Sequence, residues 1–403
     1  MSTSRKTVTK SKSPVSQRAH SIAPSGIRKF FDLLASMDGV ISLGVGEPDY
    51  TTPWHIREAA IYSLEQGRTM YTSNLGTPEL RRELASHLHQ KYGVKYDPET
   101  ELLITVGVSE ALDLAMRATI DPGDQVIIPA PCYVAYPAAV SLSGGIPIMV
   151  QTFEANNFEI SASDIENALT PSTKAILSGY PANPTGAVMP REKLASVAEV
   201  ACNNDLLVIS DEIYSRLVYG VEHTCFAALP GMQKRTILLG GFSKAYAMTG
   251  WRIGYAAGPK EIIAAMTKIH QYTIMCAPTM AQVAALEALR GGEDNVLEMV
   301  ADYNRRRKVI VKGLRDIGFS CFEPKGAFYA FPNITSTGMN SETFAEKLLQ
   351  EEKVAVVPGT AFGACGEGYV RCCYATSLPE LEEALVRIKR FVTKIRKNNE
   401  ENR

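Results

Sequence analysis

Short runs of apolar residues, which follow one another through the middle of the chain, constrain the fold most. They are LLITV (102–106), QVIIP (125–129), AILSG (175–179), LLVIS (206–210), TILLG (236–240) and IGYAAG (253–258). Each is nearly continuous rather than alternating, which is typical of strands buried on both faces. Helical patterns such as REKLASVAEVACNN lie between most of them. This alternation predicts an α/β fold with an open, mainly parallel sheet covered by helices on both faces.

The chain changes character after about residue 290. A long charged helix is expected over 295–318, followed by shorter strand candidates at 326–332, 354–359 and 369–375. The last helix opens with Ser377-Leu-Pro-Glu380, which has the pattern of a capping box. A chain of 403 residues is long for one compact unit. We therefore expect a second, smaller α+β domain after the sheet.

Composition excludes several classes of protein. A formal net charge of −1 predicts no general attraction to nucleic acid or to a membrane surface, and no apolar run is long enough to span a bilayer. The eight cysteines form no CxxC pair, which indicates reduced thiols and a cytoplasmic protein. The six histidines make no metal site, since His87 and His89 would lie on different sides of a helix. Residues 1–14 read as a disordered basic tail, with an organellar transit peptide as the alternative.

Ligands of open α/β sheets bind beyond the carboxyl ends of the strands, so the residues that follow each strand are informative. The run 102–106 leads into Gly107-Val108-Ser109, a glycine turn that opens a helix and suits a phosphate. Tyr133 follows the next run, although core packing is its commoner role. Asn183 follows the third, in the proline-rich loop YPANPTG, which could also be a plain turn.

Two charged side chains complete this edge. Asp211 ends the run LLVIS, and Lys244 follows TILLGG almost at once. Asp211 could simply cap a following helix. However, a carboxylate and a partly desolvated lysine amine at one edge are also the groups that pyridoxal phosphate requires. Lys244 and Arg252 are the only charged residues between 236 and 258, and Arg252 would supply a fixed cation for the phosphate.

Arg371 is the remaining unusual charge. It lies in YVRCCYA, among apolar and aromatic residues of a strand candidate. A buried guanidinium needs an anion. The anion could belong to an internal salt bridge or to a substrate carboxylate, and the local sequence leaves both open.

Five segments in this order resemble the motifs of the class I, fold-type I pyridoxal-phosphate aminotransferases. They are ISLGVGEPDYTTP, YPANPTGAV, SDEIY, SKAYAMTGWRIGY and GEGYVRCCYA. The similarity covers about residues 15–395, and within the family the chain looks closest to aromatic or broad-specificity enzymes of the aspartate aminotransferase family. The resemblance implies a mainly parallel seven-stranded sheet. It also implies a small domain of residues 15–50 plus 291–403 and a large cofactor-binding domain of residues 51–290.

The resemblance also implies a role for each residue around the cofactor ring. Lys244 would form the Schiff base and then act as the general base that moves a proton. Asp211 would pair with the pyridinium nitrogen. Tyr214 and Asn183 would donate hydrogen bonds to the phenolic oxygen of the ring, and Tyr133 would stack on the ring.

The phosphate and the substrate are assigned in the same way. The backbone at Val108 and Ser109, with Arg252 and Ser243, would hold the phosphate, helped by Tyr71 from a second subunit. The substrate α-carboxylate would bind Arg371 and the backbone at Gly46, beside Asn183 and Tyr133. The role of Tyr71 implies a homodimer with shared active sites.

The expected reaction is transfer of an amino group from an aromatic or broad-specificity donor to a 2-oxo acid such as 2-oxoglutarate. It would follow a ping-pong course through pyridoxamine phosphate. Some aspartate enzymes use a partner-subunit arginine for the distal carboxylate. Here the matching region, HQYTIMCAP, has Gln271 near that place and no arginine or lysine.

Several alternatives compete with this reading. A carbon–sulfur β-lyase or an aspartate-preferring aminotransferase would share most of these residues. A regulator with the same fold would need an additional DNA-binding domain, for which the tail is too short. A nucleotide-binding oxidoreductase is not supported, because Gly44-Val-Gly46 lacks a third glycine and no Walker sequence exists.

Overall fold

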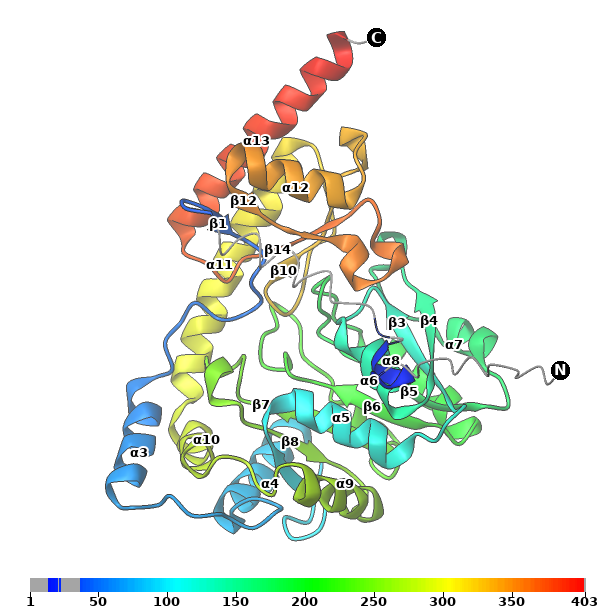
Figure 1. Cartoon of the computed structure of the whole chain (residues 1–403), viewed down its shortest axis with the longest axis vertical. Helices are drawn as coiled ribbons and strands as arrows, with labels where there is room; N and C mark the ends of the chain where they lie inside the picture. Colours follow the sequence, from blue (N-terminus) through cyan, green and yellow to red (C-terminus); the bar gives the residue numbers. More distant parts are fainter. Residues whose placement is uncertain (1–13, 21, 23–36, 402–403) are drawn as a thin grey trace, which may run out of the picture.

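A seven-stranded sheet forms the centre of the larger part of the molecule (Figure 1). The structure is a computed structural model, and it describes residues 14–20, 22 and 37–401. The strands of the sheet are β2 (Leu102–Thr105), β3 (Gln125–Ala130), β4 (Ile146–Gln151), β5 (Thr173–Ser178), β6 (Leu207–Asp211), β7 (Thr236–Gly241) and β8 (Gly254–Ala257). Their order is β2-β8-β7-β6-β5-β3-β4.

The sheet is mainly parallel, as the apolar runs predict. Strand β8 pairs antiparallel with both β2 and β7, and every other pair is parallel. The expected strands lie within one or two residues of those observed. Strand β4 was not predicted. It lies at the edge of the sheet, where half-exposed residues and Pro147 give a weak pattern, because an edge strand need not donate every backbone N–H.

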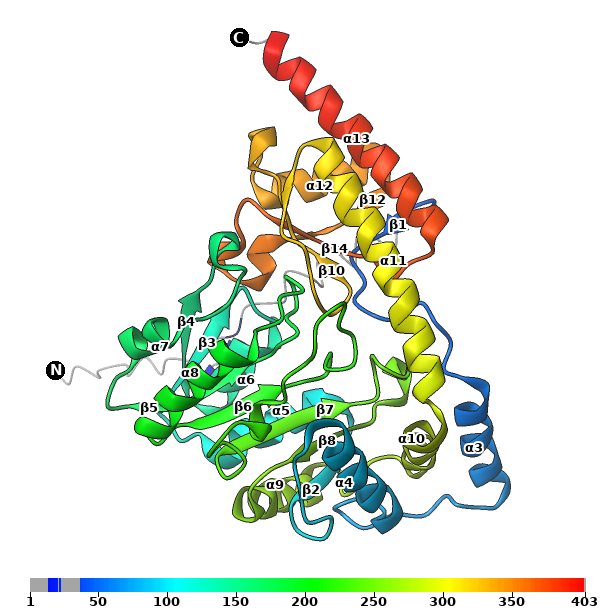
Figure 2. The same ribbon diagram turned by 180° about the vertical axis from the view of Figure 1, so that it is seen from behind.

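Helices cover both faces of the sheet, and Figures 1 and 2 view it from its two sides. One face packs against α5 (Gly107–Thr119), α6 (Ala135–Ser143) and α9 (Lys260–Thr273). The other packs against α4 (Pro78–Tyr92), α7 (Ala162–Ala168), α8 (Arg191–Asn203) and α10 (Thr279–Gly291), and α3 (Trp54–Glu65) packs against α10. The short α1 (Gln17–His20) contacts α6. Burial on both faces explains why the strands are apolar throughout.

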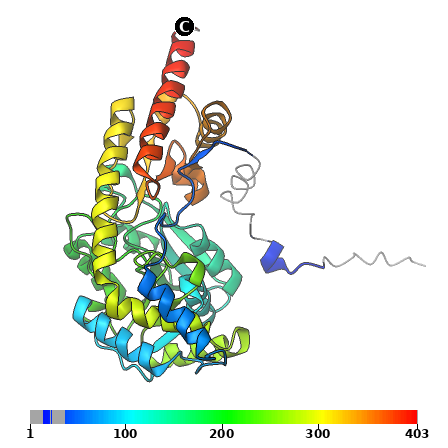
Figure 3. The same cartoon turned by 90° about the vertical axis from the view of Figure 1, so that its left-hand side faces the viewer.

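The smaller part of the molecule has its own apolar core. Its helices are α11 (Glu293–Ile317), α12 (Ser341–Glu352) and α13 (Leu378–Glu401). Its short strands are β1 (Ile41–Ser42), β9 (Ser320–Cys321), β10 (Tyr329–Ala330), β11 (Pro332–Asn333), β12 (Val354–Ala355), β13 (Val357–Pro358) and β14 (Val370–Cys373). Figure 3 shows α11 and α13 side by side.

The chain passes twice between the two parts. It leaves the smaller part after β1, which pairs with β12, and returns to it through α11. Helix α11 packs against both α10 and α13. The exact division into 15–50 plus 291–403 and 51–290 stays a prediction, and residues 1–13 of the expected tail lie outside the described residues. None of the helices in the described ranges has the length and apolar character needed to cross a membrane.

Candidate active site

A cavity of about 580 Å³ lies at the carboxyl ends of the parallel strands, between the sheet and the smaller part of the molecule. It is lined by nearly all the residues singled out in the sequence: Gly46, Val108, Ser109, Tyr133, Asn183, Asp211, Tyr214, Ser243, Lys244, Arg252 and Arg371. Tyr71 does not line it and has a residue exposure of 80%. The parallel direction of the strands brings residues more than a hundred positions apart to one edge.

One end of the cavity is built to receive an anion. Helix α5 begins there at Gly107, so the backbone N–H groups of Val108 and Ser109 lie in its first turn and have no acceptor within the helix. The Arg252 guanidinium lies against this turn, so close that a Cβ atom added at Gly107 would come 2.7 Å from its Nη2. A Cβ atom at Gly254 would come 2.8 Å from the Val108 nitrogen. The two glycines therefore allow β8, Arg252 and the helix start to meet.

A largely buried Glu110–His270 pair behind this helix start was not predicted. Glu110 accepts a hydrogen bond from the backbone N–H of Val106 (2.5 Å), and its other oxygen lies 2.7 Å from Nδ1 of His270. His270 lies on α9 and is fully buried. The pair fixes the turn that precedes the N–H groups of α5. Glu110 is visible in the sequence, but its partner lies 160 residues away.

Asp211 ends β6 in the middle of the cavity wall and has an exposure of only 6%. The Tyr136 hydroxyl donates to its Oδ2 (2.9 Å), and the backbone N–H of Ile213 donates to its Oδ1 (3.2 Å). Helix capping, the simpler alternative, is excluded because a turn rather than a helix follows β6. Burial raises the pKa of Asp211 to about 6, and a cation placed opposite would favour its ionised form.

Tyr136 is a site residue that the sequence reading missed. Its hydroxyl reaches Asp211 over Gly179, where a Cβ atom would come 2.2 Å from the hydroxyl oxygen. Its ring meets the ring of Tyr133 edge to face, with centroids 5.7 Å apart. Tyr133 lies two residues before α6 and Tyr136 in its first turn, so the sequence offers no periodic signal that would single out Tyr136.

Lys244 reaches into the cavity from the turn after β7. Its Nζ donates to the backbone carbonyl of Gly46 (2.7 Å) and lies 5.9 Å from the ring centroid of Tyr214. Burial lowers the pKa of Lys244 to about 8. The Glu47 carboxylate, which accepts a hydrogen bond from Thr249 (3.1 Å), opposes this effect. About a tenth of the amine is then neutral at pH 7, so it can take up a proton.

Arg371 projects from β14 into the opposite wall and has an exposure of 3%. Its Nη1 donates to Oδ1 of Asn183 (2.9 Å), and its Nη2 donates to the carbonyl of Gly44 (2.7 Å). The guanidinium lies 4.5 Å from the ring centroid of Tyr329. Both acceptors are neutral, and no carboxylate in the described ranges forms a salt bridge with Arg371. The internal salt bridge left open by the sequence is therefore not observed among these residues, and the guanidinium still needs an anion.

The contact with Arg371 also orients Asn183. Because Oδ1 accepts from the guanidinium, the amide NH₂ is the group left to donate into the cavity. Tyr214 lies nearby, and its hydroxyl is 2.7 Å from that of Tyr329. Burial raises the pKa of Tyr214 well above its usual value, so it stays a neutral phenol and can donate a hydrogen bond.

Tyr329 is the second lining residue that the sequence reading missed. It comes from β10, and its hydroxyl lies so close to Gly46 that a Cβ atom there would be 2.4 Å away. The segment GAFYAFP is uniformly apolar and aromatic, so nothing in it distinguishes this tyrosine from the phenylalanines beside it.

Comparison with known proteins gives one consistent result. Residues 38–388 match the model of the family described as aminotransferase class I and II. The putative aminotransferase YugH of Bacillus subtilis is 57% identical over 94% of this chain and 98% of its own. An aspartate aminotransferase of Pyrococcus abyssi is 45% identical over the same shares. The crystal structure of an aromatic aminotransferase from Pyrococcus horikoshii superposes with a TM-score of 0.87 at 42% identity, covering 91% of this chain and 99% of that one.

Proposed function

The chain belongs to the class I and II aminotransferases, which are enzymes that use pyridoxal 5′-phosphate, and from this premise we propose its substrates and the roles of its residues. The amino donor is an aromatic or otherwise varied amino acid, and the acceptor is a 2-oxo acid such as 2-oxoglutarate. The residues at the sheet edge fit the cofactor. They offer an anion site at α5, an acid in the wall and an amine between them.

Pyridoxal phosphate, when bound, supplies a protonated pyridine ring that accepts the negative charge left when a substrate Cα loses its proton. Asp211 keeps that ring protonated, because a buried carboxylate favours a cationic partner. The N–H groups of Val108 and Ser109, together with Ser243 and Arg252, bind the phosphate.

The remaining ring contacts come from three side chains. Tyr214 and the amide NH₂ of Asn183 donate to the phenolic oxygen, and Tyr133 stacks on the ring. Lys244 binds the cofactor covalently through its amine. Once the amino group of the substrate has displaced it from the cofactor, the freed amine would take the proton from the substrate Cα, a role that its pKa of about 8 suits.

The substrate carboxylate binds at Arg371. Nη1 and Nη2 already point toward Asn183 and Gly44, so the fork is held in one orientation before a substrate arrives. The backbone N–H of Gly46 also binds this carboxylate. Gly46 borders the cavity, and its own carbonyl accepts a hydrogen bond from Lys244.

The observation that carries the donor preference is the distribution of charge around the cavity. Among the described lining residues the cations are Lys244, Arg252 and Arg371, and each of them has a role in the scheme above. The acidic lining residues are Asp211, which is assigned to the ring nitrogen, and Glu47. Among these described lining residues a distal carboxylate therefore finds no further cation to pair with, and Gln271 offers only an amide. The matched proteins include both aspartate and aromatic aminotransferases, in keeping with a broad donor range.

The active unit is a homodimer in which Tyr71 reaches the phosphate of the partner's cofactor. Support comes from an exposed apolar surface, here called the Tyr71 face, made of Ile61, Tyr62, Leu64, Met70, Tyr71, Tyr272, Ile274 and Met275. Hydrogen bonds from Asn74 to Met275 O (2.7 Å) and from Thr279 to Met70 O (2.7 Å) join its two segments. An apolar surface of this kind is typical of a subunit interface.

Steady-state kinetics over a panel of amino donors, with 2-oxoglutarate as acceptor, tests the substrate assignment. Tyrosine and phenylalanine should be used with kcat/KM at least comparable to aspartate. A preference for aspartate of a hundredfold or more would overturn the assignment. The Lys244→Ala variant should lose both the turnover and the visible absorbance band of the holoenzyme, and a band unchanged in that variant would remove Lys244 from its proposed role.

A further inference from the structure

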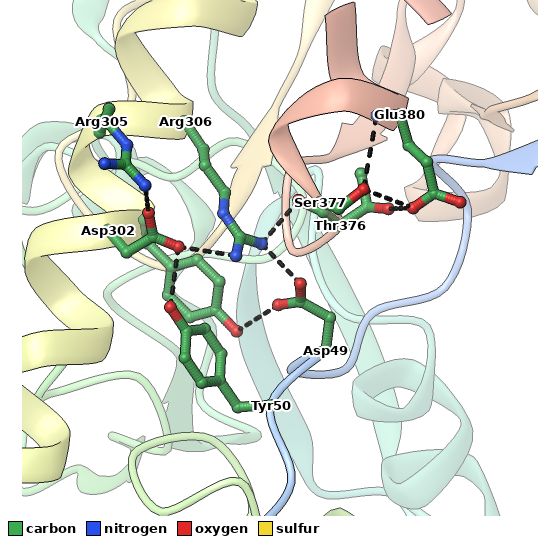
Figure 4. Close-up of polar contacts among 9 residues, drawn as sticks. Asp49, Tyr50, Asp302, Arg305, Arg306, Thr376, Ser377 and Glu380 are labelled. Carbon is green, nitrogen blue, oxygen red and sulfur yellow. Dashed lines mark hydrogen bonds and ion pairs between the residues drawn. The ribbon is translucent and has the colours of Figure 1, made fainter. Parts of the chain in front are cut away.

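A cluster of charged and polar side chains outside the cavity joins three separate segments of the chain (Figure 4). It consists of Asp49, Tyr50, Asp302, Arg306 and Thr376, and is here called the Arg306 cluster. None of these residues lines the cavity. The established reaction gives none of them a chemical task, so their arrangement calls for another explanation.

Arg306 is the centre of the cluster. It lies on α11 with an exposure of 7%, and its Nη1 donates to Oδ2 of Asp49 (2.7 Å) and to the carbonyl of Thr376 (2.6 Å). Its Nη2 pairs with Oδ2 of Asp302 (2.6 Å), one helical turn away. The Tyr50 hydroxyl donates to that same oxygen (2.8 Å). Burial and Asp302 raise the pKa of Tyr50 to about 12, so its proton remains available for this bond.

The two segments that Arg306 holds both come from the proposed carboxylate site. Asp49 lies three residues after Gly46, and Thr376 lies five residues after Arg371. Closer to the cavity the segments are joined directly, since Gly44 O accepts from Arg371 and Leu43 O accepts from the backbone N–H of Cys373 (2.7 Å). Arg306 joins them again on the far side of Gly46. The loop between these ties is Val45-Gly46-Glu47-Pro48, whose first three residues line the cavity.

The Thr376 carbonyl, which accepts the hydrogen bond from Arg306, is itself held rigidly. The hydroxyls of Thr376 and Ser377 both donate to Oε2 of Glu380 (2.8 and 3.0 Å), which fixes the turn that starts α13. The two hydroxyls lower the pKa of Glu380, so the acceptor stays ionised. A fixed carbonyl at Thr376 and a guanidinium on the 25-residue α11 give Asp49 a well-defined place.

We infer that Arg306 is a positioning residue for the substrate carboxylate, which sets the distance between the Gly46 loop and Arg371. The inference rests on the proposed binding of the carboxylate by Arg371 and Gly46. A carboxylate held by a guanidinium and a backbone N–H tolerates only about half an ångström of misplacement. Loss of Arg306 frees the Gly46 loop on one side and should weaken carboxylate binding, while the cofactor contacts at α5 and β6 stay as they are.

Arg307 provides a matched control for the simpler explanation that Arg306 only stabilises the smaller part of the molecule. It is the next residue on α11, has the same exposure of 7% and pairs with Glu323 (2.8 Å) and the carbonyl of Pro324 (3.1 Å). Neither partner belongs to the segments that carry Gly46 and Arg371. A purely structural role predicts similar effects for both arginines.

The test compares holoenzymes of Arg306→Gln and Arg307→Gln. The dissociation constant of 3-phenylpropionate, a carboxylate without an amino group, is measured from the cofactor absorbance, together with KM, kcat and cofactor affinity. We expect Arg306→Gln to raise the dissociation constant and the donor KM about tenfold, with kcat and cofactor affinity within about twofold. Arg307→Gln should leave all four within about twofold. Equal effects in both variants, or none in Arg306→Gln, would overturn the inference.

Two less disruptive substitutions provide the same comparison if Arg306→Gln does not fold. Asp49→Asn removes the charge that meets Arg306, and Glu323→Gln does the same for Arg307. The first should weaken 3-phenylpropionate binding about threefold or more and the second should not, and equal values would refute the inference.

The Arg371→Lys variant separates this inference from its premise. If Arg371→Lys binds 3-phenylpropionate as the wild type does, the carboxylate site itself is assigned wrongly. If Arg371→Lys weakens binding and Arg306→Gln does not, only the inference about Arg306 fails. If both are correct, Arg306→Gln should have a smaller effect in the Arg371→Lys background than in the wild type, because the residues act on one contact.

Discussion

Replacing Lys244 by methionine should abolish activity and yet make the cofactor-free protein more stable. The Lys244 side chain is largely buried, and burial lowers the pKa of its amine from 10.5 to about 8. At pH 7 the amine is charged in the folded and the unfolded chain alike, so the folded protein carries the unfavourable free energy of that buried charge. A shift of about 2.5 pKa units corresponds to about 3 kcal/mol. Methionine has a similar volume and no charge.

Part of this gain is lost with the hydrogen bond that Lys244 donates to Gly46 O (2.7 Å). Allowing about 1 kcal/mol for that bond leaves a net stabilisation of about 2 kcal/mol at pH 7. For a chain of this length the expected rise in Tm is about 2 °C.

The pH dependence identifies the cause. Since the folded pKa is lower than the unfolded one, the folded wild type releases this proton first as the pH rises above 8. The stability difference between Lys244→Met and wild type should therefore shrink between pH 8 and pH 10.5, and other titrating groups cancel in the difference. Urea unfolding of both cofactor-free proteins at equal concentration measures it.

Lys312→Met serves as the control, because this lysine is largely exposed and should change stability by no more than about 0.5 kcal/mol. A Lys244→Met protein that is no more stable than wild type at pH 7, or a difference that does not vary with pH, would refute the reasoning.

Three further outcomes follow from the site. Tyr136→Phe removes the hydroxyl that donates to Asp211, and Gly179→Ala displaces it. Each should weaken cofactor binding about tenfold in a titration of the apoenzyme, and unchanged affinity in both would contradict a role for this bond. Arg371→Lys loses the bidentate contact with the substrate carboxylate and should raise the donor KM about thirtyfold or more, with a smaller change in kcat. A change in kcat alone would argue against carboxylate binding by Arg371. Met70→Glu puts a carboxylate on the Tyr71 face and should yield monomers in sedimentation equilibrium, and a variant that stays dimeric would show that this face is not the interface.

The sequence determined the fold class and most of the cavity wall. Asp211 and Lys244 were predictable because each comes at the end of a buried strand or just after it, and parallel strands bring such ends to one edge. Gly107 was equally visible as the turn between a strand and a helix. In each case the relevant information is local, since a few neighbouring residues specify both the strand and the group that follows it.

Contacts between distant segments were decided by the tertiary structure alone. Tyr136 reaches Asp211 only because Gly179, directly after β5, leaves room for its hydroxyl. Tyr329 is one aromatic residue among several in the segment GAFYAFP, and packing alone turns it toward Gly46 and Arg371. Arg306 meets Asp49 across 257 residues and Thr376 across 70. No periodicity or motif encodes such meetings, because they depend on where the long helix α11 crosses the two segments.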